Sequence, residues 1–292
     1  MHKQLELHAT VPLHIQVGKL KSTVMLIFSN LKIASFAIFV WAILIGSAYA
    51  LDASKIINED TKSSTVIELF LDFVQQGKNQ DAFDVLKYAA DKGNSAAQWK
   101  LAKLYETGEQ GVKRDQLAAF KMFHQIAARS SLARPNTPSW QFSADALVAL
   151  GNYYRKGIPN TFVRLDSSKA QVMYTTAAMI FRHPGAQFEL GRMQILNDKI
   201  FGQGRLGMRN LKLAHQKGHV GAEALIGYAH VEGMHVKKNM VRGLFMLGRA
   251  EKRANDQDRE WIGQLFDEAL AIARPKDRAK AFQRLESLST SE

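Results

Sequence analysis

The sequence of 292 residues contains no cysteine, which excludes disulfide bonds, thiolate metal sites and a cysteine nucleophile. No stretch of useful length alternates apolar and polar residues as a half-buried strand would. The chain also has no Gly-x-Ser-x-Gly motif and no glycine-rich phosphate loop followed by Lys-Ser or Lys-Thr. These absences argue against a β fold, a serine hydrolase and a nucleotide-dependent enzyme, and we expect a protein without catalytic residues.

Acidic residues are fewer than basic ones, 27 against 39, so the formal net charge is +12. Such a charge attracts nucleic acid, anionic lipid or an acidic protein face without distinguishing among them. The hydrophobic fraction of 46% is typical of a chain with a packed core. The composition therefore indicates a basic, globular protein.

The first 50 residues are typical of an export signal. Lys32 precedes the apolar run 33–45, and the small residues Ala48 and Ala50 follow it in the spacing that a signal peptidase accepts. The run is shorter than the ~20 residues that a membrane span needs. We expect export to the periplasm and cleavage after Ala50, with an uncleaved anchor as the alternative and with Met1 or Met25 as the initiator.

Two short patterns alternate along the rest of the chain. The first places small residues and large apolar residues at helical spacing, and its copies begin at Ala82, Ala119, Ala170, Gly207 and Gly243. The second lies between these copies and begins at Ala97, Ala146, Ala186 and Ala222. Because self-similarity with a period of 20 to 50 residues is typical of solenoids, the sequence predicts an all-α stack of helix hairpins.

The ends of these helices carry recognisable signals. Glycines that suit the left-handed conformation just after a helix are Gly93, Gly108, Gly157, Gly218 and Gly233. Residues whose side chains can cap a helix N-terminus are Asp115, Asp166 and Asn239. Three further glycines recur where two helices should touch, at Gly151, Gly191 and Gly227.

Proline marks the departures from the repeat. Pro135 and Pro138 predict a long loop over residues 129–143, and Trp140 within that loop either pins it to the solenoid or reaches a partner as an anchor. Pro159 stretches the turn over residues 158–165. After residue 254 the repeat ends, and capping helices are expected over 256–273 and 276–288.

The string from Ala97 to Gly108, followed by Asp115 and the helix that begins at Ala119, resembles a Sel1-like repeat, a relative of the tetratricopeptide repeat. The resemblance covers residues 80–254 and implies an α-solenoid that binds other proteins. It divides the chain into a signal region (1–50), an N-terminal helix region (51–79), the repeat solenoid (80–254) and C-terminal capping helices (255–292).

The export signal, the absence of cysteine, the proline-containing insertion and the basic capping helices together resemble a family of periplasmic negative regulators of exopolysaccharide production. That resemblance implies a partner, the periplasmic domain of the sensor histidine kinase of a two-component system, which the regulator holds inactive. No cofactor is expected, and the export signal argues against nucleic acid as a partner. An envelope scaffold is the alternative function.

Four histidines lie close together in sequence: His215, His219, His230 and His235. Gly218 separates His215 from His219, so these two do not share a helical face and the group does not favour a metal site. The ordinary pKa of histidine, about 6.5, instead makes the four candidates for pH sensing. We expect acidification to weaken the regulator or its complex.

Overall fold

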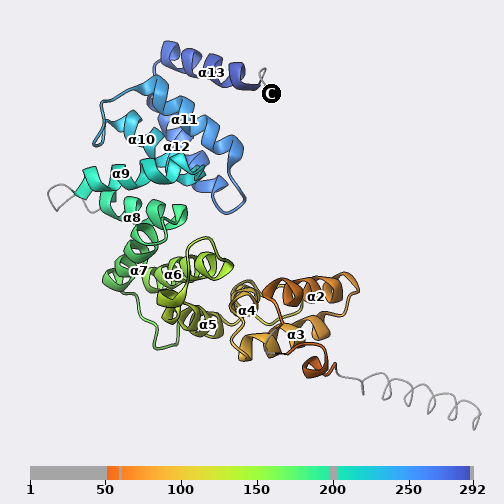
Figure 1. Ribbon diagram of the computed structural model, residues 1–292. Coiled ribbons are helices and arrows are strands. Elements are labelled where there is room, and N and C mark those ends of the chain that lie inside the picture. The colour runs from red at the N-terminus through yellow and green to blue at the C-terminus, as the bar shows by residue number, and fades with distance from the viewer. Residues whose placement is uncertain (1–50, 59–60, 197–202, 290–292) are drawn as a thin grey trace, which may run out of the picture. The chain divides into compact units, whose positions relative to one another are not determined.

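The computed structural model describes residues 51–58, 61–196 and 203–289. The chain divides into two units, Met1–Asp52 and Ala53–Glu292, and all of the helices described below belong to the second (Figure 1). The predicted signal sequence and its cleavage point after Ala50 lie outside the described residues.

Every regular element in this part of the chain is helical, which confirms the all-α prediction. None of the described helices is long and apolar enough to cross a membrane. In chain order the elements are η1 (Ala53–Lys55), α2 (Ser63–Gln75), α3 (Asn79–Asp91), α4 (Ser95–Thr107), α5 (Gln116–Ala128), η2 (Ser130–Leu132), α6 (Pro138–Lys156), α7 (Ser167–Met179), α8 (Pro184–Leu196), α9 (Gln203–Gln216), α10 (Val220–Glu232), α11 (Met240–Arg253), α12 (Arg259–Ile272) and α13 (Pro275–Ser289).

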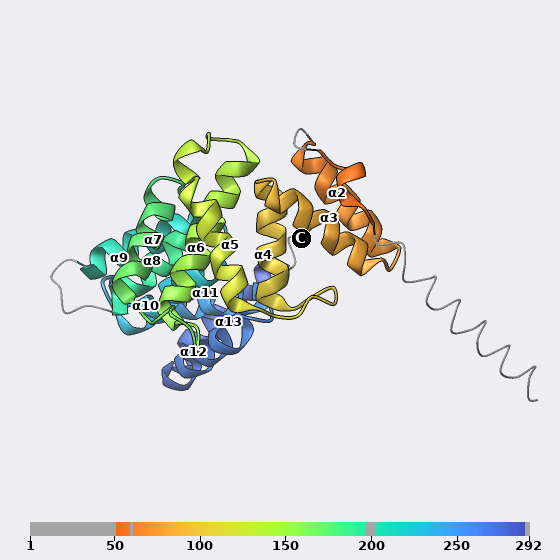
Figure 2. The ribbon, with the colours of Figure 1, turned by 90° about the horizontal axis from the view of Figure 1, so that it is seen from below.

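The helices pack as consecutive hairpins. Each of the pairs α2–α3, α4–α5, α6–α7, α8–α9 and α10–α11 forms one hairpin, and each hairpin also packs against the next. Helices α7 and α8, from neighbouring hairpins, lie side by side in both views (Figures 1 and 2). Helices α12 and α13 both pack on α11 and close the C-terminal end of the stack.

The predicted helix signals are confirmed. The side chains of Asp115, Asp166 and Asn239 accept hydrogen bonds from the backbone N–H three residues later, at 2.9, 2.9 and 3.0 Å, and so cap α5, α7 and α11. Gly108 and Gly233 follow α4 and α10 with φ of +81°, in the left-handed region that favours glycine.

A second contact joins three of the hairpins, α4–α5, α8–α9 and α10–α11, to the hairpin before each of them. The Arg129 guanidinium, just after α5, donates to the Gly93 carbonyl oxygen at 3.3 Å, and the Arg253 guanidinium at the end of α11 donates to the Gly218 carbonyl oxygen at 3.4 Å. Lys217 donates to the Arg182 carbonyl in the same way. The partners are 36, 35 and 35 residues apart, so the contact follows the repeat.

Glycines let the two helices of a hairpin approach closely, as the sequence predicts. A Cβ on Gly191 of α8 would lie 2.9 Å from the Gly207 carbonyl oxygen of α9, and one on Gly227 of α10 would lie 3.0 Å from the Gly243 carbonyl oxygen of α11. The backbones themselves are therefore in contact.

The prediction of a loop over residues 129–143 is wrong at its C-terminal half. Helix α6 begins at Pro138, so Trp140 lies in its first turn. Proline is favoured in the first turn because the N–H that it lacks would have no intrahelical partner there. The same effect starts α13 at Pro275, one residue before the start that the sequence analysis expects for the second capping helix, 276–288.

Candidate partner-binding groove

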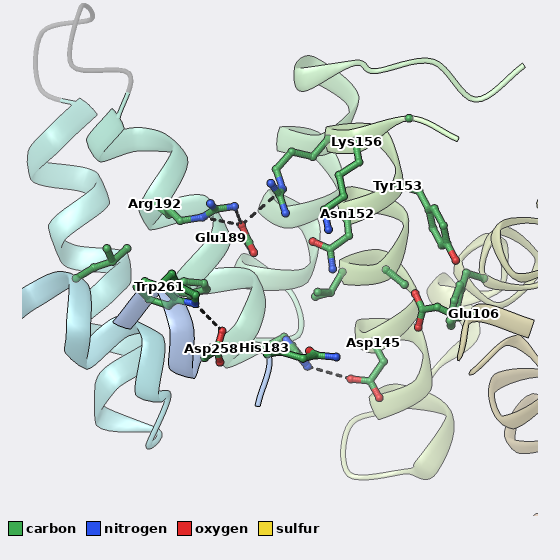
Figure 3. A pocket seen from close by; sticks show the side chains of 18 of the residues that line it. Glu106, Asp145, Asn152, Tyr153, Lys156, His183, Glu189, Arg192, Asp258 and Trp261 are labelled. Carbon is green, nitrogen blue, oxygen red and sulfur yellow. Dashed lines mark hydrogen bonds and ion pairs between the residues drawn. The ribbon is translucent and has the colours of Figure 1, made fainter. Parts of the chain in front are cut away.

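The first helices of the hairpins line a groove of about 1400 Å³ (Figure 3). Helices α4, α6, α8 and α10 each contribute side chains to it, and α12 adds Trp261 at one end. Small-molecule sites usually enclose about 300–1000 Å³. The groove is therefore larger than a site for a single small ligand and has the dimensions of a surface that receives a length of polymer.

The centre of the groove holds an ion-pair network between α6 and α8. The Glu189 carboxylate accepts from Arg192 Nε at 3.1 Å and also lies 4.0 Å from Arg155 Nε (Figure 3). Lys156, next to this network, is exposed and forms no salt bridge among the described residues. The network fixes how α6 and α8 are aligned along each other. Because one carboxylate faces three cationic side chains, this part of the groove wall carries an excess of positive charge.

A histidine joins the same two helices on the other side of the groove. His183 Nδ1 accepts from the Ala186 N–H at 3.2 Å and so caps α8, while His183 Nε2 lies 3.0 Å from an oxygen of Asp145 in α6 (Figure 3). Because Nδ1 acts as an acceptor, the proton is assigned to Nε2, which donates to the carboxylate.

Aromatic rings form the floor of the groove between α8, α10 and α12. Phe188 stacks on the His219 ring, with 4.4 Å between centroids, and lies 6.4 Å from the Trp261 ring. The Trp261 indole N–H donates to Asp258 at 2.9 Å, which fixes the orientation of the ring (Figure 3). Rigid aromatic surfaces with one polar edge are typical of protein-binding sites.

A tyrosine and a glutamate face each other between α6 and α4. The Tyr153 ring is buried against Phe120 and Phe123, and its hydroxyl points toward Glu106 (Figure 3). Burial first, and then the neighbouring Glu106 carboxylate, raise the pKa of the Tyr153 hydroxyl above its ordinary value. This hydroxyl therefore stays protonated throughout the physiological range and can act as a donor.

The groove combines apolar rings with charges of both signs, most of them already engaged by a neighbour. Its carboxylates at Glu189 and Asp145 are engaged by a guanidinium and an imidazole. Within residues 51–58, 61–196 and 203–289, no three His, Asp or Glu side chains gather as metal ligands would. The arrangement is suited to recognition of a polypeptide that carries apolar, acidic and basic side chains.

The structure places Trp140 outside this groove. Its ring packs on Phe181, with 4.3 Å between centroids, and it adds to the cluster around Tyr174. That contact fits the pinning role, since it holds the start of α6 against the segment that follows α7. A partner contact by Trp140 stays a prediction.

The four predicted pH-sensing histidines occupy different environments. His219 Nδ1 caps α10 by accepting from the Ala222 N–H at 3.3 Å, and His230 Nδ1 lies 3.2 Å from the Lys237 carbonyl oxygen. His215 lies in the last turn of α9, and His235 adopts a φ of +55°. Only His219 contacts a ring of the groove floor.

Sequence reasoning missed His183, the other histidine of the groove. The signal was its place in the repeat, because Asn94, His183 and His219 each stand three residues before the alanine that opens the second pattern and each caps the helix that follows. An asparagine at one copy identifies the position as an N-cap, and the imidazoles take the same role with Nδ1.

The stability of the protein should fall on acidification through His219. Burial lowers the pKa of His219, against smaller opposing effects of Asp258 and Glu189, while the His183 ring lowers it further. Below pH ~6.5 the His219 side chain binds a proton in the unfolded chain, whereas the folded chain resists that protonation. The contribution of neutral His219 to stability is therefore fully present above that pH and is lost as the pH falls toward the pKa of the folded state. Each unit of pKa difference corresponds to about 1.4 kcal/mol.

Denaturant unfolding between pH 7.5 and pH 5 measures this effect. His219→Asn keeps a capping side chain and removes the titration, so its stability should depend less steeply on pH than that of the wild type. His124→Asn, an exposed position on α5, is the matched control and should behave like the wild type. Identical pH profiles for His219→Asn and the wild type would show that His219 does not cause the acid sensitivity.

Comparison with known proteins agrees with this architecture. The Sel1 repeat model matches residues 95–131, 144–179 and 220–255, which contain α4–α5, most of α6 together with α7, and α10–α11. The hairpin α8–α9 lies between the second and third matched segments and has the same glycine contact as α10–α11. A crystal structure of a Sel1 repeat protein from Oxalobacter formigenes superposes with a TM-score of 0.56 over 79% of this chain and 89% of that chain, at 21% identity, and shares the fold.

Two relatives match nearly the whole chain. The exopolysaccharide production negative regulator of Rhizobium meliloti (strain 1021) is 28% identical over 91% of this chain and 95% of its own length. The protein of the same name from Rhizobium leguminosarum bv. viciae is 29% identical over 85% of this chain and 90% of its own length. The chain therefore contains Sel1 repeats and is similar over most of its length to exopolysaccharide production negative regulators.

Proposed function

We propose that this protein is a periplasmic negative regulator of exopolysaccharide synthesis that acts by binding another protein. The observation that carries the proposal is the match to a negative regulator over 91% of this chain and 95% of the relative. A match of that extent is longer than the repeat region 80–254, so it concerns more than the repeat units. A repeat fold alone would not carry a function.

The partner that we propose is the periplasmic domain of the sensor histidine kinase of a two-component system, held inactive in the complex. The groove supports a protein partner, because it exceeds the size of a small-molecule site and presents aromatic rings together with charges of both signs. Its excess of positive charge beside Lys156 would favour an acidic segment of that partner.

Deletion of the gene should raise exopolysaccharide production, and a plasmid copy should restore the normal amount. Lys156→Glu, which reverses an exposed charge in the groove, should restore less repression and should weaken binding of the kinase domain by about tenfold. Lys121→Glu makes the same charge change on α5, outside the groove, and is expected to behave like the wild type. Colony polysaccharide and calorimetric titration of the purified domains measure the two effects.

Two outcomes separate this proposal from its alternatives. An unchanged amount of exopolysaccharide in the deletion strain would reject the regulatory role. Overproduction without any binding of the kinase domain would retain the regulator and reject the partner, which would favour an envelope scaffold. Equal binding by Lys156→Glu and Lys121→Glu would place the kinase contact outside the groove.

A further inference from the structure

A second and smaller cavity lies away from the groove, on α9. It has a volume of about 400 Å³, and its lining includes Arg205, Arg209, Lys212 and His235. The three permanent cations are spaced by four and three residues, so they share one face of the helix. All three side chains are exposed, whereas the face that packs on α8 is formed by residues such as Gly207 and Leu211.

The cations of this cavity lack acidic partners among the residues that the structure describes. No salt bridge there involves Arg205, Arg209 or Lys212, and α9 itself contains no acidic residue. Like charges at such spacings destabilise a helix. The sequence thus retains an unfavourable arrangement that a bound anion would reverse.

The backbone at two positions, His235 itself and Gly204, determines where the fourth side chain of the cavity lies. The φ of His235, +55°, is uncommon for a residue other than glycine. Its ring lies where the Cβ of any other residue at Gly204 would stand, since a Cβ there would be 2.1 Å from Nε2 and from Cε1. The close fit of the ring on Gly204 brings an imidazole to the cations at the start of α9.

We propose that Arg205, Arg209, Lys212 and His235 form a binding site for a phosphate group. Two guanidinium groups offer paired donors that match the oxygens of a phosphate, and an ammonium group adds a third positive charge. A dianion balances this charge better than the single charge of a carboxylate does. A phospholipid headgroup and a soluble phosphate both offer this group.

The test uses the full mature chain and two probes at constant ionic strength. Inorganic phosphate is titrated by calorimetry, and vesicles of phosphatidylcholine with or without one quarter of phosphatidylglycerol are used in a sedimentation assay. The wild type should bind phosphate, the anionic vesicles or both, and Arg209→Gln should weaken that binding by about tenfold or more. Lys280→Gln removes an equal charge from an exposed position on α13 and should bind like the wild type.

The outcomes identify the source of the phosphate or reject the site. Binding of free phosphate supports a soluble ligand, and binding of the anionic vesicles alone supports a lipid headgroup. Equal losses in Arg209→Gln and Lys280→Gln would overturn the proposal, because only net charge would then matter. Failure here leaves the regulatory proposal intact, because the cavity and the groove share none of the lining residues that the structure describes.

Discussion

Glu223→Ala is expected to destabilise the protein by about 3 kcal/mol, the low end of the range for breaking a buried ion pair. Glu223 lies in α10 with no exposed surface, and its carboxylate accepts from Arg249 and, at 3.0 Å, from Arg253, both in α11. Removal of the carboxylate leaves two guanidinium groups without their partner. Because both arginines are partly exposed, water can compensate some of the loss.

Thermal and denaturant unfolding measure the change, and an exposed pair provides the control. Asp256 and Arg259 form a salt bridge of 3.8 Å in which both side chains are mostly exposed. Asp256→Ala should therefore change stability by no more than about 0.5 kcal/mol. If Glu223→Ala were as mild as Asp256→Ala, the buried pair would not stabilise the α10–α11 hairpin.

The importance of Glu223 illustrates what the sequence alone could not provide. Gln98, Gln187 and Glu223 occupy the same position in three of the four copies of the second pattern, directly after its first alanine, and all three are buried. The sequence analysis found the period but did not single out these polar residues. Their burial depends on the approach of the next helix, as when Lys217 reaches Gln187 at 3.2 Å from 30 residues away.

Local signals, in contrast, were sufficient to predict the hairpins. Asp115 and Gly108 act through hydrogen bonds and dihedral angles within a few residues of their own position, so a pattern in the sequence identifies them. Pro138 was misinterpreted because proline both ends and begins helices, and the choice depends on which neighbours pack around it. The packing of Trp140 on Phe181 is one such long-range contact.

The residues of the groove could be predicted from the sequence only in part. Its aromatic residues Tyr153 and Phe188 lie within the repeats and are buried, and both also line the groove. The ion pair of Glu189 with Arg155 joins different repeats. No pattern within one repeat predicts such a contact, because it depends on how the hairpins are stacked.

The contact between α8 and α9 should tolerate no side chain at Gly191. A Cβ there would lie 2.9 Å from the Gly207 carbonyl oxygen and 3.0 Å from Leu211, so Gly191→Ala forces two backbones apart. This cost opposes the gain of about 1 kcal/mol that alanine brings to a helix interior, and we expect a net loss of stability. Gly191→Leu should cost a further ~1–3 kcal/mol or more, because the added atoms have no space between the helices.

Gly263 of α12 provides the matched control, since a Cβ there would meet only the Glu251 carboxylate at 3.7 Å. Gly263→Ala should therefore gain up to about 1 kcal/mol from helix propensity. The same substitution is thus expected to change the unfolding free energy in opposite directions at the two glycines. If Gly191→Leu unfolded at the same temperature as the wild type, the helices could not touch at Gly191, and the hairpin geometry shared by α8–α9 and α10–α11 would have to be reassigned.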